Sequence, residues 1–299
     1  MNSSHQKHFY SKLLILLIGI FVISACALTQ RVEAGKLQSA TKSQVPELKK
    51  TMIIIFENTD YDKALAQPFF NQIAKKGALL SNFNAEIHPS QANYIALISG
   101  TTNGVVGDGS QDVDAPNLVD LLEAKQKTWK VYAEKYPGNC FTGKVASTYV
   151  RKHNPFISFK NIQKNPTRCA NIVDATQLDI DIAANNLADF LFYVPDLNND
   201  GHDTDVAYAD RWFSKDFGPR LQNPLFNKNL TMFVTFDESA SYFGNHIYTA
   251  VYGDSVKAGS MDSSRYDHYS LLRTIEEGMG LGNLGQNDTK SAAITNIWK

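Results

Sequence analysis

The chain has 299 residues, of which 43% are hydrophobic and 20% charged, and its formal net charge is -1. This length accommodates one large α/β domain or two small ones, with a sizeable core. The balanced charge argues against a dedicated nucleic-acid-binding protein, which would carry a basic excess, so we expect no nucleic-acid partner.

The N-terminus has the pattern of a signal peptide. Basic residues precede the apolar stretch Leu13–Val22, and the small residues Ser24–Ala27 follow. Ile23-Ser24-Ala25-Cys26 resembles a bacterial lipobox, which would leave Cys26 lipidated and attach the protein to a membrane. The same residues also fit ordinary cleavage after Ala27. Either way we expect an exported protein, held in the bacterial cell envelope or periplasm as a lipoprotein, or secreted.

Apolar extended runs and amphipathic stretches alternate through the rest of the chain. We divide the chain into a signal peptide at 1–26, a linker at 27–48 and a folded domain at 49–299. The runs that predict strands are Met52–Phe56, Ala78–Phe83, Trp129–Tyr132, Phe190–Val194, Met232–Phe236 and Ile247–Tyr252. The stretches that predict helices are Pro68–Lys76, Asn117–Lys125, Asp205–Phe217 and Tyr269–Glu277. This alternation predicts an α/β domain with a largely parallel sheet.

A histidine, a proline and a serine open a further short helix, which we expect to end at Gly100. Pro89 keeps His88 out of the helical region, so the helix can begin near Ser90. Free N–H groups at a helix start attract anions. The Ser90 hydroxyl would lie beside them, although a serine at this position commonly serves only as an N-cap.

Acidic and amide residues follow three predicted strands. Glu57-Asn58 comes after the first, the segment Asp196–Asp205 after the fourth, and Asp237-Glu238 after the fifth. Ligands gather at the carboxyl ends of parallel strands. Carboxylates meeting there repel one another unless a cation or a proton lies among them, so the pattern predicts a divalent metal site. Each residue alone could also be a turn or cap residue.

The segment after the fourth strand fits the first half of a calcium loop. Asp196 to Gly201 match its early positions, but Ala207 stands where a bidentate glutamate is required. We therefore interpret the segment as an acidic turn that presents His202. A surface lipoprotein that binds calcium and catalyses nothing stays open as an alternative of another class.

Two cysteines remain after the signal segment. In an oxidising compartment, Cys140 and Cys169 form a plausible disulfide that closes an irregular excursion rich in Lys, Asn, Pro and Thr. Two unpaired buried thiols are the alternative. No carboxylate pattern accompanies His153 within this excursion, so we interpret His153 as a surface residue.

Five short motifs resemble, in their order along the chain, those of the phosphoesterase family of bacterial acid phosphatases and non-haemolytic phospholipases C. The motifs are Glu57-Asn58, His88-Pro89-Ser90 with Asn93-Tyr94, Asp196 to Asp203, Asp237-Glu238, and His268 to Glu276. The resemblance covers residues 51 to 283. It implies an alkaline phosphatase-like fold, in which helices cover both faces of a doubly wound, largely parallel sheet.

The resemblance also implies roles for individual residues. The implied metal ligands are Glu57, Asn58, Asp237 and Glu238, and the implied nucleophile is Ser90. The residues implied to bind phosphate or a second metal are Asp196, Asp203, Asn93 and His268, together with His202. Ala92 departs from the proline usual in the family. The spacing from Asp196 to His202 exceeds that of nucleotide pyrophosphatase relatives, which argues against a full two-zinc centre.

These residues predict metal-dependent hydrolysis of phosphate esters through a Ser90 phosphoenzyme, as in an acid phosphatase-like phosphomonoesterase. His202 or His88 would protonate the leaving group, with an orienting or phosphate-side role as the alternative for His88. The cofactor would be Ca, Mg, Mn or Zn, and the substrate a small phosphate ester. A phospholipase C-type phosphodiesterase acting on a phospholipid is the alternative enzyme. Aromatic residues that could line its apolar entrance, or simply pack in the core, are Phe69, Phe70 and Trp212.

Overall fold

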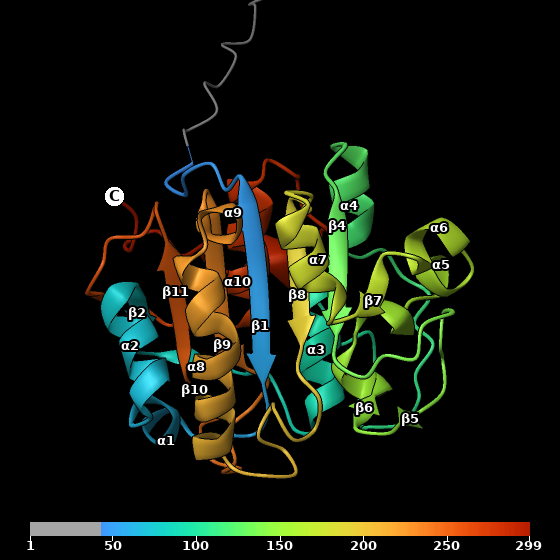
Figure 1. Cartoon of the computed structure of the whole chain (residues 1–299), viewed down its shortest axis with the longest axis horizontal. Coiled ribbons are helices and arrows are strands. Elements are labelled where there is room, and N and C mark those ends of the chain that lie inside the picture. Colours follow the sequence, from blue (N-terminus) through green and yellow to red (C-terminus); the bar gives the residue numbers. More distant parts are fainter. Residues whose placement is uncertain (1–42) are drawn as a thin grey trace, which may run out of the picture. The chain divides into compact units, whose positions relative to one another are not determined.

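A computed structural model describes residues 43–299, which form an eight-stranded sheet with helices on both faces (Figure 1). The predicted signal peptide, Cys26 and most of the predicted linker lie outside the described residues. Val45 and Leu48 belong to the end of that linker, yet both are buried, so packing begins before residue 49. No helix within residues 43–299 has the length and apolar character needed to cross a membrane.

The main sheet has the strand order β12-β2-β11-β9-β1-β8-β4-β7. Its strands are β1 Lys50–Phe56, β2 Ala78–Leu80, β4 Trp129–Ala133, β7 Ile172–Asp174, β8 Phe190–Val194, β9 Leu230–Phe236, β11 Thr249–Gly253 and β12 Ser260–Asp262. Within this sheet only β11 is antiparallel to its neighbours β9 and β2. The predicted largely parallel α/β sheet is therefore confirmed.

Several short strands were not predicted from the sequence. Two hairpin-like pairs lie outside the main sheet: β3 Phe83–Asn84 with β10 His246–Ile247, and β5 Val145–Ala146 with β6 Tyr149–Val150. The edge strands β7 and β12 have three residues each and end in aspartate, so neither shows an apolar run. Pairing with a longer neighbour, rather than local pattern, defines these strands.

All five predicted helices are present. The helices are α1 Tyr61–Leu65, α2 Pro68–Lys76, α3 Ser90–Ser99, α4 Leu118–Ala124, α5 Lys160–Gln163, α6 Pro166–Cys169, α7 Gln177–Ala183, α8 Val206–Gln222, α9 Pro224–Asn227 and α10 His268–Gly278. Three 3-10 turns are η1 Arg151–His153, η2 Phe156–Ser158 and η3 Asn287–Thr289. In Figure 1, α2, α8 and α9 lie in front of the sheet, and α3 and α10 lie behind it.

Aromatic residues fill the space between the central strands and the helices in front of them. The ring of Phe56 at the end of β1 lies edge-on to Phe70, with 4.9 Å between centroids, and also contacts Phe213. Phe69 and Phe70 are buried, and Trp212 packs against Phe56 and Tyr193. These residues therefore belong to the core and line no entrance for a lipid.

A carboxyl pair lies buried where the C-terminal half of α10 meets the loop before η3. Glu276 is fully buried, and neither of its carboxyl oxygens has a hydrogen-bond partner within residues 43–299. The neighbouring Asp288 is also buried and accepts the N–H groups of Leu284 and Gln286. Burial, and then the charge of Asp288, raise the pKa of Glu276 to about 8. Glu276 is thus protonated in the folded protein at neutral pH.

Glu276→Gln should stabilise the protein at alkaline pH. The unfolded chain loses the Glu276 proton near pH 4.5 and the folded chain near pH 8, so the free energy of unfolding falls between these values as pH rises. Glutamine keeps the shape of the protonated acid and removes this loss. We expect its advantage to grow from about zero at pH 4.5 to on the order of 2–4 kcal/mol above pH 8, measured by urea unfolding.

Glu277→Gln is the matched control, because the Glu277 carboxylate pairs with Arg273 and accepts a hydrogen bond from Ser43. Its effect on stability should vary little between pH 5 and 9. If the stability difference between Glu276→Gln and the wild type were also constant across this range, Glu276 would be ionised in the folded protein and the expectation would be wrong.

Candidate active site

The sheet brings two acidic dipeptides to one edge. Strand β1 lies between β9 and β8 and is parallel to both, with Ile54 opposite Val234 on one side and Tyr193 on the other. The Asp237 N–H donates to Phe56 O at 3.0 Å, and the Thr59 N–H donates to Glu238 O at 3.2 Å. As a result, Glu57-Asn58 and Asp237-Glu238 leave the sheet side by side.

Ser90 meets these dipeptides at the first turn of α3. Its hydroxyl lies 3.0 Å from Glu57 Oε2, and 3.4 Å from both Asn58 Oδ1 and Glu238 Oε1. Pro89 holds the N-cap position, and the Ser90 side chain is not an N-cap. The expected helix start and its end at Gly100 are confirmed, whereas the hydroxyl faces the acidic cluster instead of the helix backbone.

Asn58 completes a shell of oxygen atoms. The inward atom of its amide lies 3.1–3.3 Å from carboxylate oxygens of Glu57, Asp237 and Glu238. Turned as an NH₂ group, this atom would donate to those carboxylates; turned as an oxygen, it faces acceptors alone and needs a cation among them. The NH₂ orientation satisfies the site without an ion, and a bound cation would turn the amide oxygen inward. Three carboxylates, an amide oxygen and a hydroxyl suit a hard divalent cation.

The charges of this oxygen cluster, defined as Glu57, Asn58, Ser90, Asp237 and Glu238, require compensation. Burial, and then Asp237, raise the pKa of Glu57 well above its ordinary value. Burial, and then Glu238, raise the pKa of Asp237 in the same way. The pKa of Glu238 rises to about 8, through burial and then the charge of Glu57. Either protons or a cation must therefore balance the three carboxyls, and a bound cation reverses these shifts.

Each glutamate divides its two oxygens between the cluster and a histidine. Glu57 directs Oε2 at Ser90, while its Oε1 accepts a 2.5 Å hydrogen bond from the Tyr94 hydroxyl and lies 3.1 Å from His153 Nε2. Glu238 directs Oε1 at Ser90 and Oε2 at His88 Nδ1, 2.8 Å away. Both imidazoles therefore stand behind carboxylates and orient them, outside the cluster itself.

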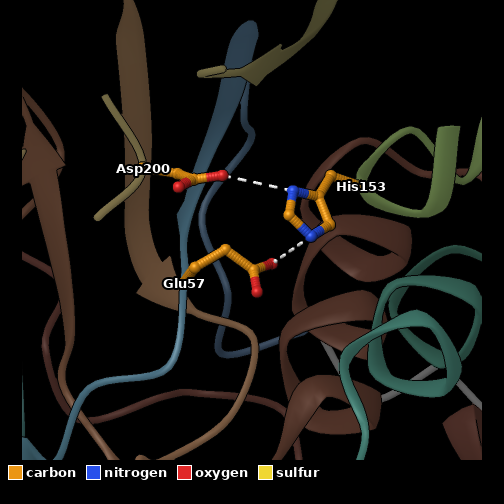
Figure 2. Close-up of side chains that lie close together, drawn as sticks. All are labelled: Glu57, His153 and Asp200. Atoms are coloured by element: carbon orange, nitrogen blue, oxygen red, sulfur yellow. Dashed lines mark ion pairs between the residues drawn. The ribbon is translucent and has the colours of Figure 1, made fainter. Parts of the chain in front are cut away.

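His153 lies at the centre of the site, contrary to the expectation of a surface position. Its side chain is buried between Glu57 and Asp200, with Nδ1 3.1 Å from Asp200 Oδ2 (Figure 2). Burial lowers the pKa of His153 to about 4, although Glu57 opposes this shift. Neither ring nitrogen has a well-aligned hydrogen-bond partner within residues 43–299. The three residues offer ligand atoms within 4.8 Å of one another, so this group could also hold a metal ion.

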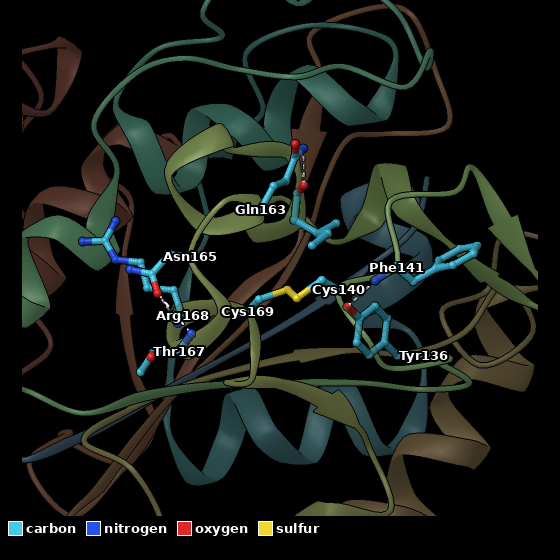
Figure 3. The surroundings of a disulfide bond; sticks show 9 residues. Tyr136, Cys140, Phe141, Gln163, Asn165, Thr167, Arg168 and Cys169 are labelled. Atoms are coloured by element: carbon cyan, nitrogen blue, oxygen red, sulfur yellow. Dashed lines mark hydrogen bonds between the residues drawn. A yellow bond between two sulfur atoms is a disulfide. The ribbon is translucent and has the colours of Figure 1, made fainter.

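The excursion between β4 and β7 carries His153 to the site. Cys140 and Cys169 form the predicted disulfide across 29 positions of the chain (Figure 3). Close to Cys140, the Phe141 N–H donates to the Tyr136 hydroxyl at 3.0 Å. Because the bond joins the two ends of this irregular segment, it restricts the freedom of η1, which lies between them and contacts α3.

The other predicted residues lie around the cluster in supporting positions. Asp196 accepts hydrogen bonds from two N–H groups of its own turn and from the Thr148 hydroxyl, so it stabilises a turn, and its role in binding phosphate or a second metal stays a prediction. His268 is buried, with Nδ1 2.6 Å from Glu86 and Nε2 3.1 Å from the Phe236 carbonyl. Both nitrogens are thus occupied by protein partners, and His268 fixes the strand end before Asp237; its role in phosphate binding stays a prediction.

Asn93, His202 and Asp203 are less central. The Asn93 amide accepts two backbone N–H groups from the segment before His88 and donates to Ile87 O, so it holds that segment in place. His202 pairs with the adjacent Asp203, and its ring lies 5.9 Å from that of His153 at the rim of the site. Roles for these three in phosphate binding stay predictions.

The sequence interpretation missed His153 and the neighbouring Lys152. Both lie on η1, where no strand end, periodicity or spacing marks them. The one available signal was the cysteine pair, which indicates that the excursion between them returns to the sheet.

A family model for the phosphoesterase family matches residues 59–282. The chain belongs to the phosphoesterase family. The matched region begins just after Glu57-Asn58 and includes Ser90 and Asp237-Glu238. Curated relatives include a probable acid phosphatase from Kluyveromyces lactis, 38% identical over 80% of this chain and 60% of its own length. A phosphatidylinositol-3-phosphatase from Mycobacterium tuberculosis is 30% identical over 93% of this chain and 92% of its own length.

The chain spans 55 to 66% of the length of the fungal acid phosphatases that it matches. Among solved structures, a Vibrio parahaemolyticus protein of the alkaline phosphatase superfamily has a TM-score of 0.58 at 13% identity. The matched region covers 84% of this chain and 72% of the Vibrio protein. A lipoteichoic acid synthase from Listeria monocytogenes has a TM-score of 0.59 at 12% identity, with coverages of 83% and 77%. These likenesses confirm the predicted alkaline phosphatase-like fold.

Asp237→Asn should have opposite effects with and without a divalent cation. Without the cation, the variant relieves repulsion among buried carboxylates, and we expect it to match or exceed wild-type stability by about 1–2 kcal/mol. With the cation at about 100 times its Kd, the wild type gains about 2.7 kcal/mol and the variant gains less. Thermal unfolding in chelator, and then in Ca, Mg, Mn or Zn, measures this reversal, and calorimetry measures binding.

Asp62→Asn is the control, because Asp62 is an exposed carboxylate in the first turn of α1 and lies outside the oxygen cluster. This variant should bind the cation as the wild type does. Wild-type unfolding that is unchanged by chelator and by all four metals would rule out the metal site.

Proposed function

We propose that this protein is a metal-dependent phosphatase that hydrolyses phosphate monoesters through a phosphoserine at Ser90. The observation that carries the proposal is the convergence of the buried Ser90 hydroxyl, at the start of α3, with Glu57, Asn58 and Glu238. The names of the curated relatives, acid phosphatases among them, support the same chemistry. A calcium-binding protein without activity would have no need of a serine and a histidine in this arrangement.

The residues that would hold the divalent cation are Glu57, Asn58, Asp237 and Glu238, with the Ser90 oxygen beside them. A cation bound here would lower the pKa of the Ser90 hydroxyl and neutralise charge on the transferring phosphoryl group. The oxygen-only donor set favours Mg, Ca or Mn over Zn. The Glu57, His153 and Asp200 group, with one imidazole, would suit a second ion.

In the first step, the Ser90 hydroxyl proton passes to Glu57 Oε2, 3.0 Å away, as Ser90 Oγ attacks phosphorus and the bond from phosphorus to the ester oxygen breaks. His88 is the best-placed proton donor for the leaving oxygen. Its Nδ1 is held by Glu238, and its Nε2 is buried without a protein partner among the described residues. Water then attacks the phosphoserine and His88 accepts the water proton, while the bond from phosphorus to Oγ breaks and Oγ takes its proton back from Glu57. His202, at the rim, is the second candidate for this proton transfer.

A phospholipid substrate is the second candidate, and a specific observation favours it. Tyr242 and Phe243 follow the Asp237-Glu238 dipeptide and are 83% and 92% exposed. The Tyr242 ring lies 5.0 Å from that of His88, so these aromatic side chains flank the reacting groups. Exposed aromatic side chains next to a site suit contact with acyl chains or a lipid surface.

We infer that the protein is exported. The basic and apolar pattern of the first residues supports export, and so does the disulfide, which persists in oxidising compartments. Cell envelope, periplasm and secretion are all compatible with it. A lipid on Cys26 would add membrane attachment.

Ser90→Ala should reduce hydrolysis of 4-nitrophenyl phosphate by at least about 10⁴-fold in kcat, because the variant lacks the hydroxyl that forms the proposed covalent intermediate. His88→Asn should lose about 10²–10⁴-fold on an alkyl phosphate but much less on 4-nitrophenyl phosphate, whose leaving group needs no proton. Rapid-quench trapping of phosphoserine measures the intermediate directly. Ser90→Ala with near wild-type turnover would reject the nucleophile assignment, and equal losses on both substrates would reject the role of His88 as a proton donor.

A comparison of substrates should separate the two candidate activities. We expect turnover of 4-nitrophenyl phosphate and of vesicles containing phosphatidylinositol phosphate, both monoesters, to exceed that of phosphatidylcholine, a diester, by at least about 100-fold in kcat/KM. The Ser90→Ala protein is the control for contaminating hydrolases. Preferred release of phosphocholine from phosphatidylcholine would instead establish the phospholipase C activity.

A further inference from the structure

Lys152 is a cation beside the oxygen cluster that the proposed mechanism does not use. It lies on η1 between Arg151 and His153, and its side chain is only 17% exposed. Burial lowers the pKa of Lys152, but Glu57 and then Asp108 raise it by more, so that the pKa lies above its ordinary value. Lys152 therefore carries a full positive charge at neutral pH, close to the candidate catalytic carboxylates.

Asp108 connects Lys152 to the residue after Ser90. The Lys152 ammonium donates to Asp108 Oδ2 at 2.9 Å, and the Gln91 N–H donates to Asp108 Oδ1 at 3.1 Å. One carboxylate thus spans the ammonium and the first turn of α3, and it fixes their separation. Because Gln91 follows Ser90 directly, Lys152 is held next to the place where a phosphoryl group on Ser90 would lie.

The two basic residues of η1 differ in what their charged groups contact, although each leaves N–H groups unpaired among the described residues. Arg151 donates to the backbone carbonyls of Thr142 and Gln111 and to the Asp112 carboxylate, all in neighbouring loops. Lys152 makes one hydrogen bond, to Asp108, among the described residues, so two of its three N–H groups stay available. A stabilising role would account for Arg151. Donors left available on a partly buried ammonium point to a ligand of negative charge.

We propose that Lys152 binds the non-bridging oxygens of the substrate phosphate, and that Asp108 positions it, so that the site favours monoesters over diesters. The inference rests on the proposed phosphatase function and adds a determinant of specificity. A phosphate monoester carries between one and two negative charges at pH 7 and offers three terminal oxygens, whereas a diester carries one charge and offers two. A fixed ammonium therefore stabilises the bound monoester more strongly.

Lys152→Met tests this assignment, with Lys152→Arg as the conservative variant. Removing a charge-assisted contact to phosphate should raise KM for 4-nitrophenyl phosphate and the inhibition constant of inorganic phosphate by about 10–100-fold. Turnover of bis(4-nitrophenyl) phosphate should change by less than about threefold, so the preference for monoesters falls at least about tenfold. Lys152→Arg should restore part of this preference. Asp108→Asn, which leaves Lys152 less well positioned, should give a smaller change in the same direction.

Lys160→Met is the matched control, because Lys160 forms a similar but exposed ion pair with Asp114, 3.5 Å apart. It should leave KM and phosphate inhibition unchanged. If Lys152→Met lowers monoester and diester turnover equally, or leaves phosphate inhibition at the wild-type value, Lys152 only connects loops and the inference is wrong.

Calorimetric titration of inorganic phosphate into Ser90→Ala and into Ser90→Ala with Lys152→Met keeps the test independent of turnover. We expect weaker binding in the double variant by about 10–100-fold. A Ser90→Ala protein with wild-type activity would overturn the proposed function itself. An inactive Ser90→Ala protein whose phosphate affinity is unaffected by Lys152→Met would overturn this inference alone.

Discussion

Parallel pairing of β1 with β9 forces two acidic dipeptides onto one edge of the sheet, and the rest of the site depends on this crowding. Glu57, Asp237 and Glu238 are all nearly inaccessible to solvent, so water cannot screen their charges. Mutual repulsion and burial raise the pKa of each. Such a cluster is costly for folding unless a proton or a cation resides there. A site that must recruit positive charge is suited to phosphoryl transfer, which concentrates negative charge.

The contacts of Glu57 and Glu238 fix the orientation of both carboxylates in the cluster. Each commits one oxygen to the cluster and the other to an imidazole, so the rotation of the carboxylate is fixed from behind. The Tyr94 hydroxyl adds a third constraint on Glu57, from one helical turn beyond Ser90. Helix α3 thus supplies both the hydroxyl in the cluster and a group that aligns its acceptor. An alignment that depends on one rigid element keeps these groups in register without a mobile loop.

The sequence could predict these parts because strand ends obey a simple rule. Long apolar runs marked β1, β8 and β9, and parallel pairing then placed Glu57-Asn58 beside Asp237-Glu238. The same rule pointed to Asp196, and the family resemblance to His268. Each has local partners in the structure: turn N–H groups for Asp196, and Glu86 for His268. A carboxylate that follows a strand can accept hydrogen bonds from a turn or bind a ligand, and the sequence pattern is the same in both cases. The hydrogen-bond donors around the carboxylate in the folded structure distinguish the two roles.

The two nitrogen groups that the cysteine-bounded excursion contributes, on His153 and Lys152, could not be predicted, and the reason is physical. Strand ends deliver short acidic and amide side chains through tight turns, whereas His153 and Lys152 arrive on a 3-10 turn in the middle of a long crossover. That crossover has little periodicity, and a disulfide rather than a core of its own restricts it. The sheet therefore provides the carboxylate and amide oxygens, and the excursion provides the buried imidazole of His153 and the ammonium of Lys152. Changes in the excursion can alter which phosphate group is accepted while the oxygen cluster and its nucleophile stay in place.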